Sequence, residues 1–244
     1  MTEELQGPSR KEIWKMFNQI SPTYDVANRV FTFGLDQLWR KKMCAFLPPR
    51  KEMHVLDCAT GTGDQIIALM AKRPDIAHVT GIDLADEMVE IGKQKIAKKP
   101  YASKVSMEIA SALSIPYPDN HFDAVTISFG IRNVTDMMTA FHEFLRVLKP
   151  GGRLLILEGT VPEKKWLRSI HLFYLRHLLP NIGGVISKNV DAYRYLNKTI
   201  ETFPQGEKFT EKMQAAGFHH THCYPLLGGI STIYQGEKDA PVHH

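Results

Sequence analysis

Apolar and polar positions alternate with a regular rhythm between residues 53 and 158. Short runs rich in β-branched residues are followed by helix-length amphipathic segments, a pattern that predicts parallel strands joined by crossover helices. We expect strands at 53–57, 78–83, 104–110, 122–128 and 152–158. The clearest helices are expected at 64–72, 86–98 and 135–148.

The pattern changes near the end of the chain. A helical segment at 207–217 is followed by two strand-like runs, 218–227 and 230–236, which are separated by Gly228 and Gly229. Glycine adopts positive φ at little steric cost, so this pair suits a tight reversal between antiparallel strands. The whole pattern predicts an α/β fold with a Rossmann-like, seven-stranded and mostly parallel sheet that ends in an antiparallel C-terminal hairpin.

Composition narrows the possible functions. The 30 Lys and Arg residues nearly balance the 26 Asp and Glu residues, so the formal charge of +4 predicts no nucleic-acid partner and only mild attraction to anionic lipid. The three cysteines, Cys44, Cys58 and Cys223, are widely spaced, as in proteins of a reducing cytosol. Neither a signal peptide nor an apolar run of the ~18 residues that span a membrane is found. We therefore expect a soluble, cytoplasmic protein.

Several histidines near the C-terminus raise the question of a metal site. His219, His220 and His222 lie beside Cys223. Alternate residues of a strand face opposite sides of the sheet, and few carboxylates are near in the sequence. We therefore expect no bound metal.

A glycine-containing turn follows the first predicted strand. The segment VLDCATGTGD, residues 55–64, places Gly61 and Gly63 between that strand and its helix, where doubly wound sheets bind ligands. Glycine lets the backbone approach a ligand closely, but strand-to-helix turns also use glycine for steric reasons alone. The turn by itself leaves both interpretations open.

Two residues beside this turn indicate the charge of its ligand. A dinucleotide-binding turn has a third glycine at position 66, where the bulky Ile66 stands. Asp64 is expected to cap the helix start, where its carboxylate would repel a pyrophosphate. The turn therefore favours a cationic sulfonium ligand over NAD.

Two further carboxylates lie near the turn. Asp83 ends the second predicted strand, twenty residues after Gly63, where it can accept hydrogen bonds from both hydroxyls of a ribose. The alternative is that Asp83 only starts a turn while Asp86 caps the next helix. For Asp57 two roles stay open, steadying the loop or meeting the ligand's amino group through water.

Four segments resemble the menaquinone and ubiquinone biosynthesis C-methyltransferases, which are class I S-adenosylmethionine-dependent enzymes. In chain order they are MFNQISPTYDVANRVFTFGLDQLWRK, VLDCATGTGD, PYPDNHFDAVTISFGIRNVTD, and LKPGGRLLILE followed by DAYRYL. Many methyltransferases share the central parts, whereas ISFGIRN, WRK and DAYRYL resemble pieces specific to quinone-ring methylation. The resemblance implies methyl transfer from S-adenosylmethionine to a ring carbon of a prenylated quinol, with demethylmenaquinol as the expected substrate and menaquinol as the product.

The resemblance also implies which residues bind the cofactor. With the loop glycines Gly61 and Gly63, the expected contacts are Thr62, Asp83, Ser111, Ala112 and Ser128. This chain departs from the family pattern at two positions, because Thr60 stands where a second glycine is usual and Ser111 replaces an acidic or amide side chain. Ser111 can alternatively bond only its own turn. We expect its adenine contacts to be weak or water-mediated.

These features predict a single methyltransferase domain over 1–244. A chain of this length with 43% hydrophobic residues fits one α/β core. The expected parts are an N-terminal helical cap (1–50), a cofactor-binding core (51–160), a helical insertion (161–200) and a C-terminal helix and hairpin (201–236). The helical additions should cover the ligand edge of the sheet.

Arg132 and Asn133, which follow the fourth predicted strand, are the candidate catalytic residues. A quinol ring carbon gains electron density when a ring hydroxyl ionises, although such a hydroxyl has a pKa near ~10 in water. Arg132 would supply a fixed positive charge near the anion and Asn133 a hydrogen bond. The alternative for Arg132 is an ion pair with Asp136. No metal is required, because the cofactor carries the reactivity.

Two other features bear on the substrate. By the resemblance, Tyr24, Asp25 and Tyr195 are candidate substrate neighbours, although tyrosines more often pack with one hydrogen-bonded hydroxyl. Residues 166–179 combine a broad apolar surface with two arginines and two histidines, as in helices that meet a membrane surface or a prenyl tail. For this segment we favour a core helix.

The expected partners are a prenylated quinol, a membrane touched peripherally at its inner face, and a second copy of the chain in a homodimer. Three other functions stay open. They are methyl transfer to another lipophilic or phenolic acceptor, noncatalytic S-adenosylmethionine binding, and nicotinamide-dependent oxidoreduction. The intact ISFGIRN segment disfavours the noncatalytic alternative.

Overall fold

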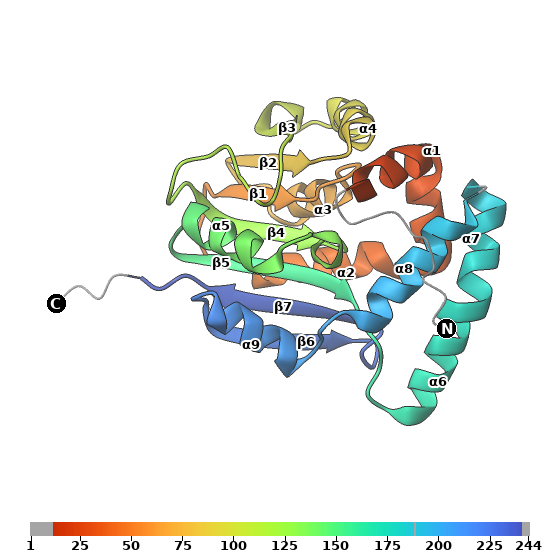
Figure 1. The fold of residues 1–244 in the computed structure, drawn as a ribbon. Coiled ribbons are helices and arrows are strands. Elements are labelled where there is room, and N and C mark those ends of the chain that lie inside the picture. Colours follow the sequence, from red (N-terminus) through yellow and green to blue (C-terminus); the bar gives the residue numbers. More distant parts are fainter. Residues whose placement is uncertain (1–11, 188, 241–244) are drawn as a thin grey trace.

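A seven-stranded mixed sheet organises the described part of the protein (Figure 1). The computed structural model describes residues 12–187 and 189–240, so the start of the predicted cap and the terminal His243 and His244 lie outside the described residues. The strand order is β3-β2-β1-β4-β5-β7-β6. Strands β1 to β5 run parallel, whereas β7 is antiparallel to β5 and to β6. The predicted fold class is confirmed.

Six strands lie within one residue of their predicted bounds, whereas the fifth begins four residues earlier than predicted. Their bounds are β1 His54–Cys58, β2 His78–Asp83, β3 Val105–Ile109, β4 Phe122–Ser128, β5 Leu148–Gly159, β6 His219–Leu226 and β7 Ser231–Glu237. Between β6 and β7, Gly228 and Gly229 adopt φ values of 72° and 97°. The predicted glycine reversal of the hairpin is therefore confirmed.

Helices cover both faces of the sheet and one of its ends. Those that pack on the faces are α3 Asp64–Lys72, α4 Asp86–Ala97, α5 Met137–Val147 and α9 Glu207–Ala215, within two residues of their predicted bounds. The additional helices are α1 Ile13–Phe31, α2 Leu35–Met43, α6 Lys165–Phe173, α7 Leu179–Ser187 and α8 Val190–Thr202, with a π-helical turn, Tyr174–Leu178, between α6 and α7. In Figure 1, α1, α7 and α8 gather where the arrows of β1, β2 and β4 point. Helices α1, α7 and α8 thus cover the carboxyl ends of the parallel strands, whereas α2 packs against α3 and β5 on one face of the sheet.

Burial on both sides of the sheet explains the continuous apolar strands. All seven residues of β4 are buried. Consecutive residues of β1 enter opposite clusters, because Leu56 packs with Phe141 on one face and Val55 with Trp39 on the other. A parallel sheet covered by helices on both faces requires this pattern.

The space for Ile66 at the start of α3 comes from the neighbouring strand. A Cβ atom at Gly81 of β2 would lie 2.8 Å from Cδ1 of Ile66 and 3.0 Å from the side chain of Thr60. The missing side chain at position 81 therefore accommodates the residue that stands in place of a third loop glycine. Helix α3 can pack closely on the sheet without that glycine.

The segment 166–179 is not the predicted core helix, because one side of it is exposed to solvent. The side chains of Trp166, Ile170 and Phe173 are 65%, 60% and 59% exposed. Only the opposite side of the segment is buried, because α6 lies at the margin of the molecule and has packing partners on one side (Figure 1). Within the described ranges, none of the helices is both long enough and apolar enough to cross a bilayer.

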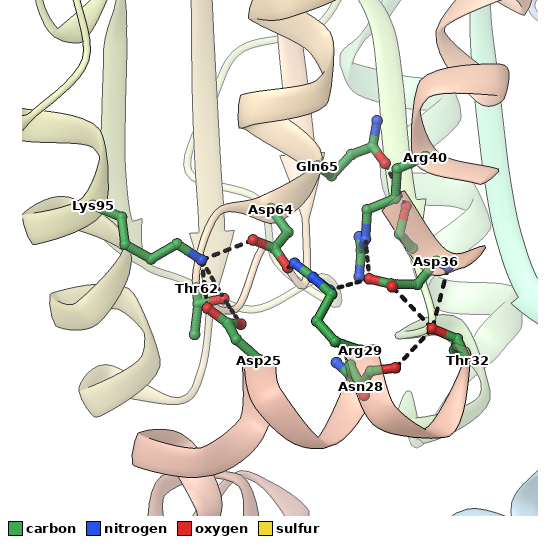
Figure 2. A network of polar contacts seen from close by, with 11 residues as sticks. Asp25, Asn28, Arg29, Thr32, Asp36, Arg40, Thr62, Asp64, Gln65 and Lys95 are labelled. Carbon is green, nitrogen blue, oxygen red and sulfur yellow. Dashed lines mark hydrogen bonds and ion pairs between the residues drawn. The ribbon is translucent and has the colours of Figure 1, made fainter. Parts of the chain in front are cut away.

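A polar network fastens α1 to the core (Figure 2). The Nζ atom of Lys95, on α4, lies 2.6 Å from Oδ2 of Asp25, 2.8 Å from Oδ1 of Asp64 and 3.2 Å from Oγ1 of Thr62. Arg29 of α1 donates one hydrogen bond to Oδ2 of Asp64. Three parts of the chain, α1, the start of α3 and α4, therefore meet through one polar network, which we call the α1 tether.

Asp64 has a different role from the helix cap that we predicted. It is the first residue of α3, its side chain caps no helix, and it pairs instead with Lys95 and Arg29. Burial opposes its ionisation, but the charges of Arg40, Lys95 and Arg29 outweigh that effect and hold the pKa of the carboxyl below its ordinary value. The predicted cap is wrong because these distant cations compete for the carboxylate.

We predict that Lys95→Met lowers the free energy of unfolding by ~1–2 kcal/mol, because two partly buried carboxylates lose a shared cation. Denaturant unfolding measures this change, and hydrogen exchange should show faster exchange of the α1 amides. Lys93→Met is the matched control on the same helix, since Lys93 forms only an exposed pair with Glu90 at 3.9 Å. Equal effects of the two substitutions would contradict a tethering role.

Candidate functional site

The strand order reverses between β1 and β4, and the loops after these strands diverge there. Ala59, directly after β1, and Phe129, directly after β4, adopt φ values of 51° and 58°. Left-handed backbone at residues other than glycine costs roughly 1–3 kcal/mol and concentrates at functional sites. A Cβ atom at Gly130 would lie 2.6 Å from Cβ of Ala59, so the two loops touch. Open α/β sheets bind ligands at this switch point.

A cavity of about 410 Å³ opens at this switch point. We call it the glycine-loop pocket. Among the predicted cofactor contacts, its lining includes Gly61, Asp83, Ser111, Ala112 and Ser128. Thr62 and Gly63 lie in the same loop but outside the lining. The structure thus brings together side chains from the ends of β1, β2, β3 and β4.

Backbone hydrogen bonds hold Asp83 in place. Its Oδ2 atom accepts from the Gly61 N–H at 2.8 Å, and its Oδ1 atom accepts from the Ala85 N–H at 2.9 Å. Asp83 therefore does start a turn, as in the alternative interpretation, but Ala85 rather than Asp86 is the N-cap of α4. Burial raises the pKa of Asp83, although the backbone N–H groups oppose that shift. A carboxylate has about four acceptor positions, so lone pairs stay free for a ligand.

Protein atoms already engage the three predicted hydroxyl groups. Thr62 donates to Oδ1 of Asp25 at 2.6 Å, and Ser128 donates to Oε1 of Gln65 at 3.0 Å. Ser111 accepts the N–H of Leu113 at 3.1 Å, which is the own-turn contact considered above. Thr62 thus joins the α1 tether, whereas Ser111 and Ser128 keep a place in the pocket wall.

Asp57 lies beneath the loop rather than in the pocket. Its carboxylate accepts hydrogen bonds from the hydroxyls of Thr60 and Thr126, each at 2.6 Å. The side chain is 1% exposed, and this burial raises the pKa of Asp57 to about 6. Of the two roles left open, the structure shows the contacts that steady the loop.

A second cavity of about 400 Å³, which we call the apolar pocket, lies beside the first. Helices α1, α2, α6 and α8 supply most of its aliphatic and aromatic lining. Four residues line both cavities: Phe17, Tyr24, Phe129 and Asn133. We call these four residues the shared wall. The sequence did not indicate this arrangement, because four separate segments build it.

The candidate substrate neighbours divide between the apolar pocket and the α1 tether. Tyr24 and Tyr195 line the apolar pocket. Asp25 instead accepts hydrogen bonds from Thr62 and Lys95 and belongs to the tether. Burial raises the pKa of Tyr24, so its hydroxyl stays protonated at neutral pH. The apolar pocket therefore presents neutral groups along α1.

Arg132 pairs with Glu158, which the sequence did not indicate, and not with Asp136. Both side chains are buried, and the guanidinium Nη1 donates to Oε1 of Glu158. Asp136 is engaged as the N-cap of α5, where it accepts from the Thr139 N–H at 3.0 Å. The predicted alternative partner is therefore wrong, because helix capping uses the local carboxylate. Burial raises the pKa of Glu158, and Arg132 opposes that shift.

Among the buried polar atoms that lack a hydrogen-bond partner in the described part of the chain, two belong to adjacent residues in the turn after β4. They are Nε of Arg132 and Oδ1 of Asn133, both buried. Both residues line the apolar pocket, and Asn133 also lines the glycine-loop pocket. Buried polar atoms are rarely left without a hydrogen bond, so these atoms indicate a place where a polar ligand group binds.

The described ranges contain no group of three or more His, Cys, Asp or Glu side chains placed to hold a metal ion. Among the histidines near the C-terminus, Nε2 of His219 lies 3.0 Å from Oδ2 of Asp239. The absence of a metal cofactor stays a prediction.

We predict that Asp57 makes stability depend on pH. Its folded pKa of about 6 lies above the ordinary 3.8, so its stabilising contribution is present below pH 3.8 and is lost as the pH rises through 6. Asp57→Asn cannot titrate. Between about pH 4.5 and about pH 7, the unfolding free energy of the unsubstituted protein should fall relative to this variant by about 2 kcal/mol. Urea denaturation across this range measures the difference, and parallel curves would contradict the assignment.

Known proteins match this chain over nearly its whole length. The profile of the ubiE/COQ5 methyltransferase family matches residues 6–238. A ubiquinone/menaquinone biosynthesis C-methyltransferase UbiE of Geotalea daltonii is 42% identical over 228 residues, which cover 93% of this chain and 97% of the relative. A demethylmenaquinone methyltransferase of Bacteroides fragilis is 36% identical over 233 residues, which cover 95% of this chain and 94% of the relative.

Solved structures share the fold at low sequence identity. A possible histamine N-methyltransferase of Thermotoga maritima has a TM-score of 0.65 and 18% identity, with 93% of this chain and 99% of that chain covered. The [4+2]-cyclase SpnF has a TM-score of 0.63 and 15% identity, with 96% and 98% covered. One fold thus serves different chemistries, and the sequence relatives are more specific. The family profile and the two sequence relatives together show that the chain belongs to the ubiE/COQ5 methyltransferase family.

Proposed function

We propose that this protein transfers a methyl group from S-adenosylmethionine to a ring carbon of a prenylated quinol, most directly converting demethylmenaquinol to menaquinol. The observation that carries the proposal is the shared wall between a polar-edged cavity and an apolar cavity of similar size. A methyl transferase must hold donor and acceptor side by side and keep water out. The names of the two sequence relatives support the quinone precursor as acceptor.

The glycine-loop pocket fits an adenosyl ligand. Asp83 offers acceptor positions for ribose hydroxyls, and Gly61 at φ 53° lets the backbone come close. Apolar side chains such as Leu84, Met88 and Leu113 provide surfaces for a flat base. When bound, S-adenosylmethionine supplies an electrophilic methyl group. We propose Gly61, Asp83, Ser111, Ala112 and Ser128 as direct contacts, and Thr62 and Gly63 as residues that shape the loop.

The apolar pocket fits the ring and the first part of a prenyl tail. Its lining is almost entirely aliphatic and aromatic, apart from a few polar groups that include Arg132 and Asn133. We propose that the unpartnered amide oxygen of Asn133 accepts a hydrogen bond from a ring hydroxyl. Arg132, held by Glu158, would favour the ionised ring through its charge and its free Nε–H. Glu158 partly neutralises the charge of Arg132. The main effect of Glu158 is therefore to orient the guanidinium.

The proposal extends to the surroundings of the protein. In this proposal the protein acts on a prenylated quinol and needs neither a metal nor a nucleic acid. It works in the cytoplasm and at the inner face of the membrane, and it forms a homodimer. The near-balanced charge supports the exclusion of nucleic acid. An apolar pocket joined to the cofactor pocket disfavours a noncatalytic S-adenosylmethionine-binding protein, which needs only one of them.

Ligand titration and product analysis test this function. The purified protein should bind S-adenosylmethionine in calorimetry and should not bind NADH. With methyl-labelled cofactor, a demethylnaphthoquinol and the corresponding benzoquinol, label should appear on the ring carbon of the naphthoquinol.

Asp83→Ala should weaken cofactor affinity by roughly 10- to 100-fold, since two charged hydrogen bonds are lost. Absence of S-adenosylmethionine binding, or label on oxygen, would refute the proposal.

We predict that Arg132→Lys reduces kcat at least 100-fold and leaves the Kd for S-adenosylmethionine within about twofold, because a charge remains but its planar fork is lost. Lysine keeps a cation beside Glu158, so the fold is preserved. Asp136→Asn is the control, and its kcat should match that of the unsubstituted protein, since Asp136 only caps α5. Stopped assays with the labelled cofactor measure kcat of both variants, and calorimetry measures the Kd for S-adenosylmethionine. Unchanged turnover in the Arg132 variant would exclude a role in the reaction.

A further inference from the structure

The outer side of α6 carries a row of apolar side chains that nothing in the described ranges covers. Trp166, Ile170 and Phe173 follow each other at spacings of four and three residues, which places them on one side of a helix. Each is more than half exposed. Single exposed apolar residues are ordinary, but a contiguous row marks a surface that meets another apolar phase.

The charged side chains of α6 itself are all basic, although the exposed Glu163 lies just before Lys164. Residues 164–190 contain five Lys and Arg residues and neither Asp nor Glu. Lys164, Lys165 and Arg168 are exposed, and in the described part of the chain they form no ion pair. Aromatic and aliphatic residues beside unpaired cations are typical of helices that lie in the interface of an anionic membrane. A two-fold dimer through this side would instead bring like charges together.

The apolar pocket opens on the same side of the molecule. Phe33, Ile170 and Leu227 are exposed to solvent and also line that pocket. Its rim is therefore continuous with the row on α6. A ligand tail that leaves the pocket reaches an apolar surface before it reaches water.

We propose that this surface docks on an anionic lipid bilayer. We call it the membrane face and define it by Lys164, Lys165, Trp166, Arg168, Ile170 and Phe173, with the pocket rim at Phe33 and Leu227. The membrane contact depends only on the surface itself. The further consequence, that a prenyl tail passes from the bilayer into the apolar pocket, depends on the proposed function.

Vesicle flotation tests the docking. Without substrate, the protein should float with vesicles of phosphatidylcholine and phosphatidylglycerol and much less with phosphatidylcholine alone. Trp166→Ser with Phe173→Ser should reduce the bound fraction at least tenfold, because apolar area is lost at the interface. Lys164→Gln with Lys165→Gln should lower the partition coefficient on the mixed vesicles by about 25-fold. These four positions are outside the lining of both pockets.

Matched controls lie on the far edge of the sheet. Ile109 at the end of β3 is 61% exposed, and Ile109→Ser should float like the unsubstituted protein. Lys98→Gln with Lys99→Gln removes an exposed lysine pair next to α4 and should also float normally. If the control pairs lose as much binding as the α6 pairs, the attraction is nonspecific and the membrane face is rejected.

The remaining outcomes separate the possibilities. Equal flotation on both vesicle types would contradict a surface that selects anionic lipid. A dimer in light scattering that dissociates in Trp166→Ser with Phe173→Ser, together with no flotation, would show that a second copy occupies the face and would overturn the proposal. Calorimetry with S-adenosylmethionine on the same samples keeps the two proposals apart. Flotation without cofactor binding refutes only the methyl transfer, and cofactor binding without flotation refutes only the docking.

Discussion

One helix crossing the end of the sheet is the constraint on which the site depends. Helix α1 supplies walls to both cavities, and Phe17 and Tyr24 belong to the wall that they share. A helix at the surface needs a fixed position for that task, and the ion pairs of Lys95 and Arg29 provide it (Figure 2). Because these groups are only partly exposed, they are screened less than surface pairs. Loosening the tether would open both cavities together.

Backbone strain on the opposite side completes the arrangement. The left-handed conformations of Ala59 and Phe129 turn the chain sharply as β1 and β4 end, and Phe129 lines both cavities. Beneath them, the buried Asp57 joins Thr60 of the loop to Thr126 of β4. The glycine loop therefore rests on a rigid base while α1 closes it from the other side. Such preorganisation suits a reaction that depends on alignment.

Local patterns in the sequence predicted the sheet and its crossover helices, because burial of parallel strands and helix amphipathicity leave signals over a few residues. The glycine turn and Asp83 were likewise readable, since each ends a strand. Contacts between distant segments could not be predicted from such local patterns. Arg132 pairs with Glu158, which lies 26 residues away. Asp64 pairs with Lys95, which lies 31 residues away, and does not cap its own helix. The exposure of α6 also escaped prediction, because an apolar stripe does not reveal whether another element packs on it.

The central claim is that an adenosyl ligand and a quinol ring bind in the two adjoining cavities and meet where Phe17, Tyr24, Phe129 and Asn133 line both of them. A crystal structure with S-adenosylhomocysteine and a short-tailed quinol analogue tests it most directly. The account predicts the ribose hydroxyls on Asp83, the ring in the apolar pocket, and the sulfur facing that ring between the residues that line both cavities. An adenosyl group bound elsewhere, or a ring outside that pocket, would contradict it.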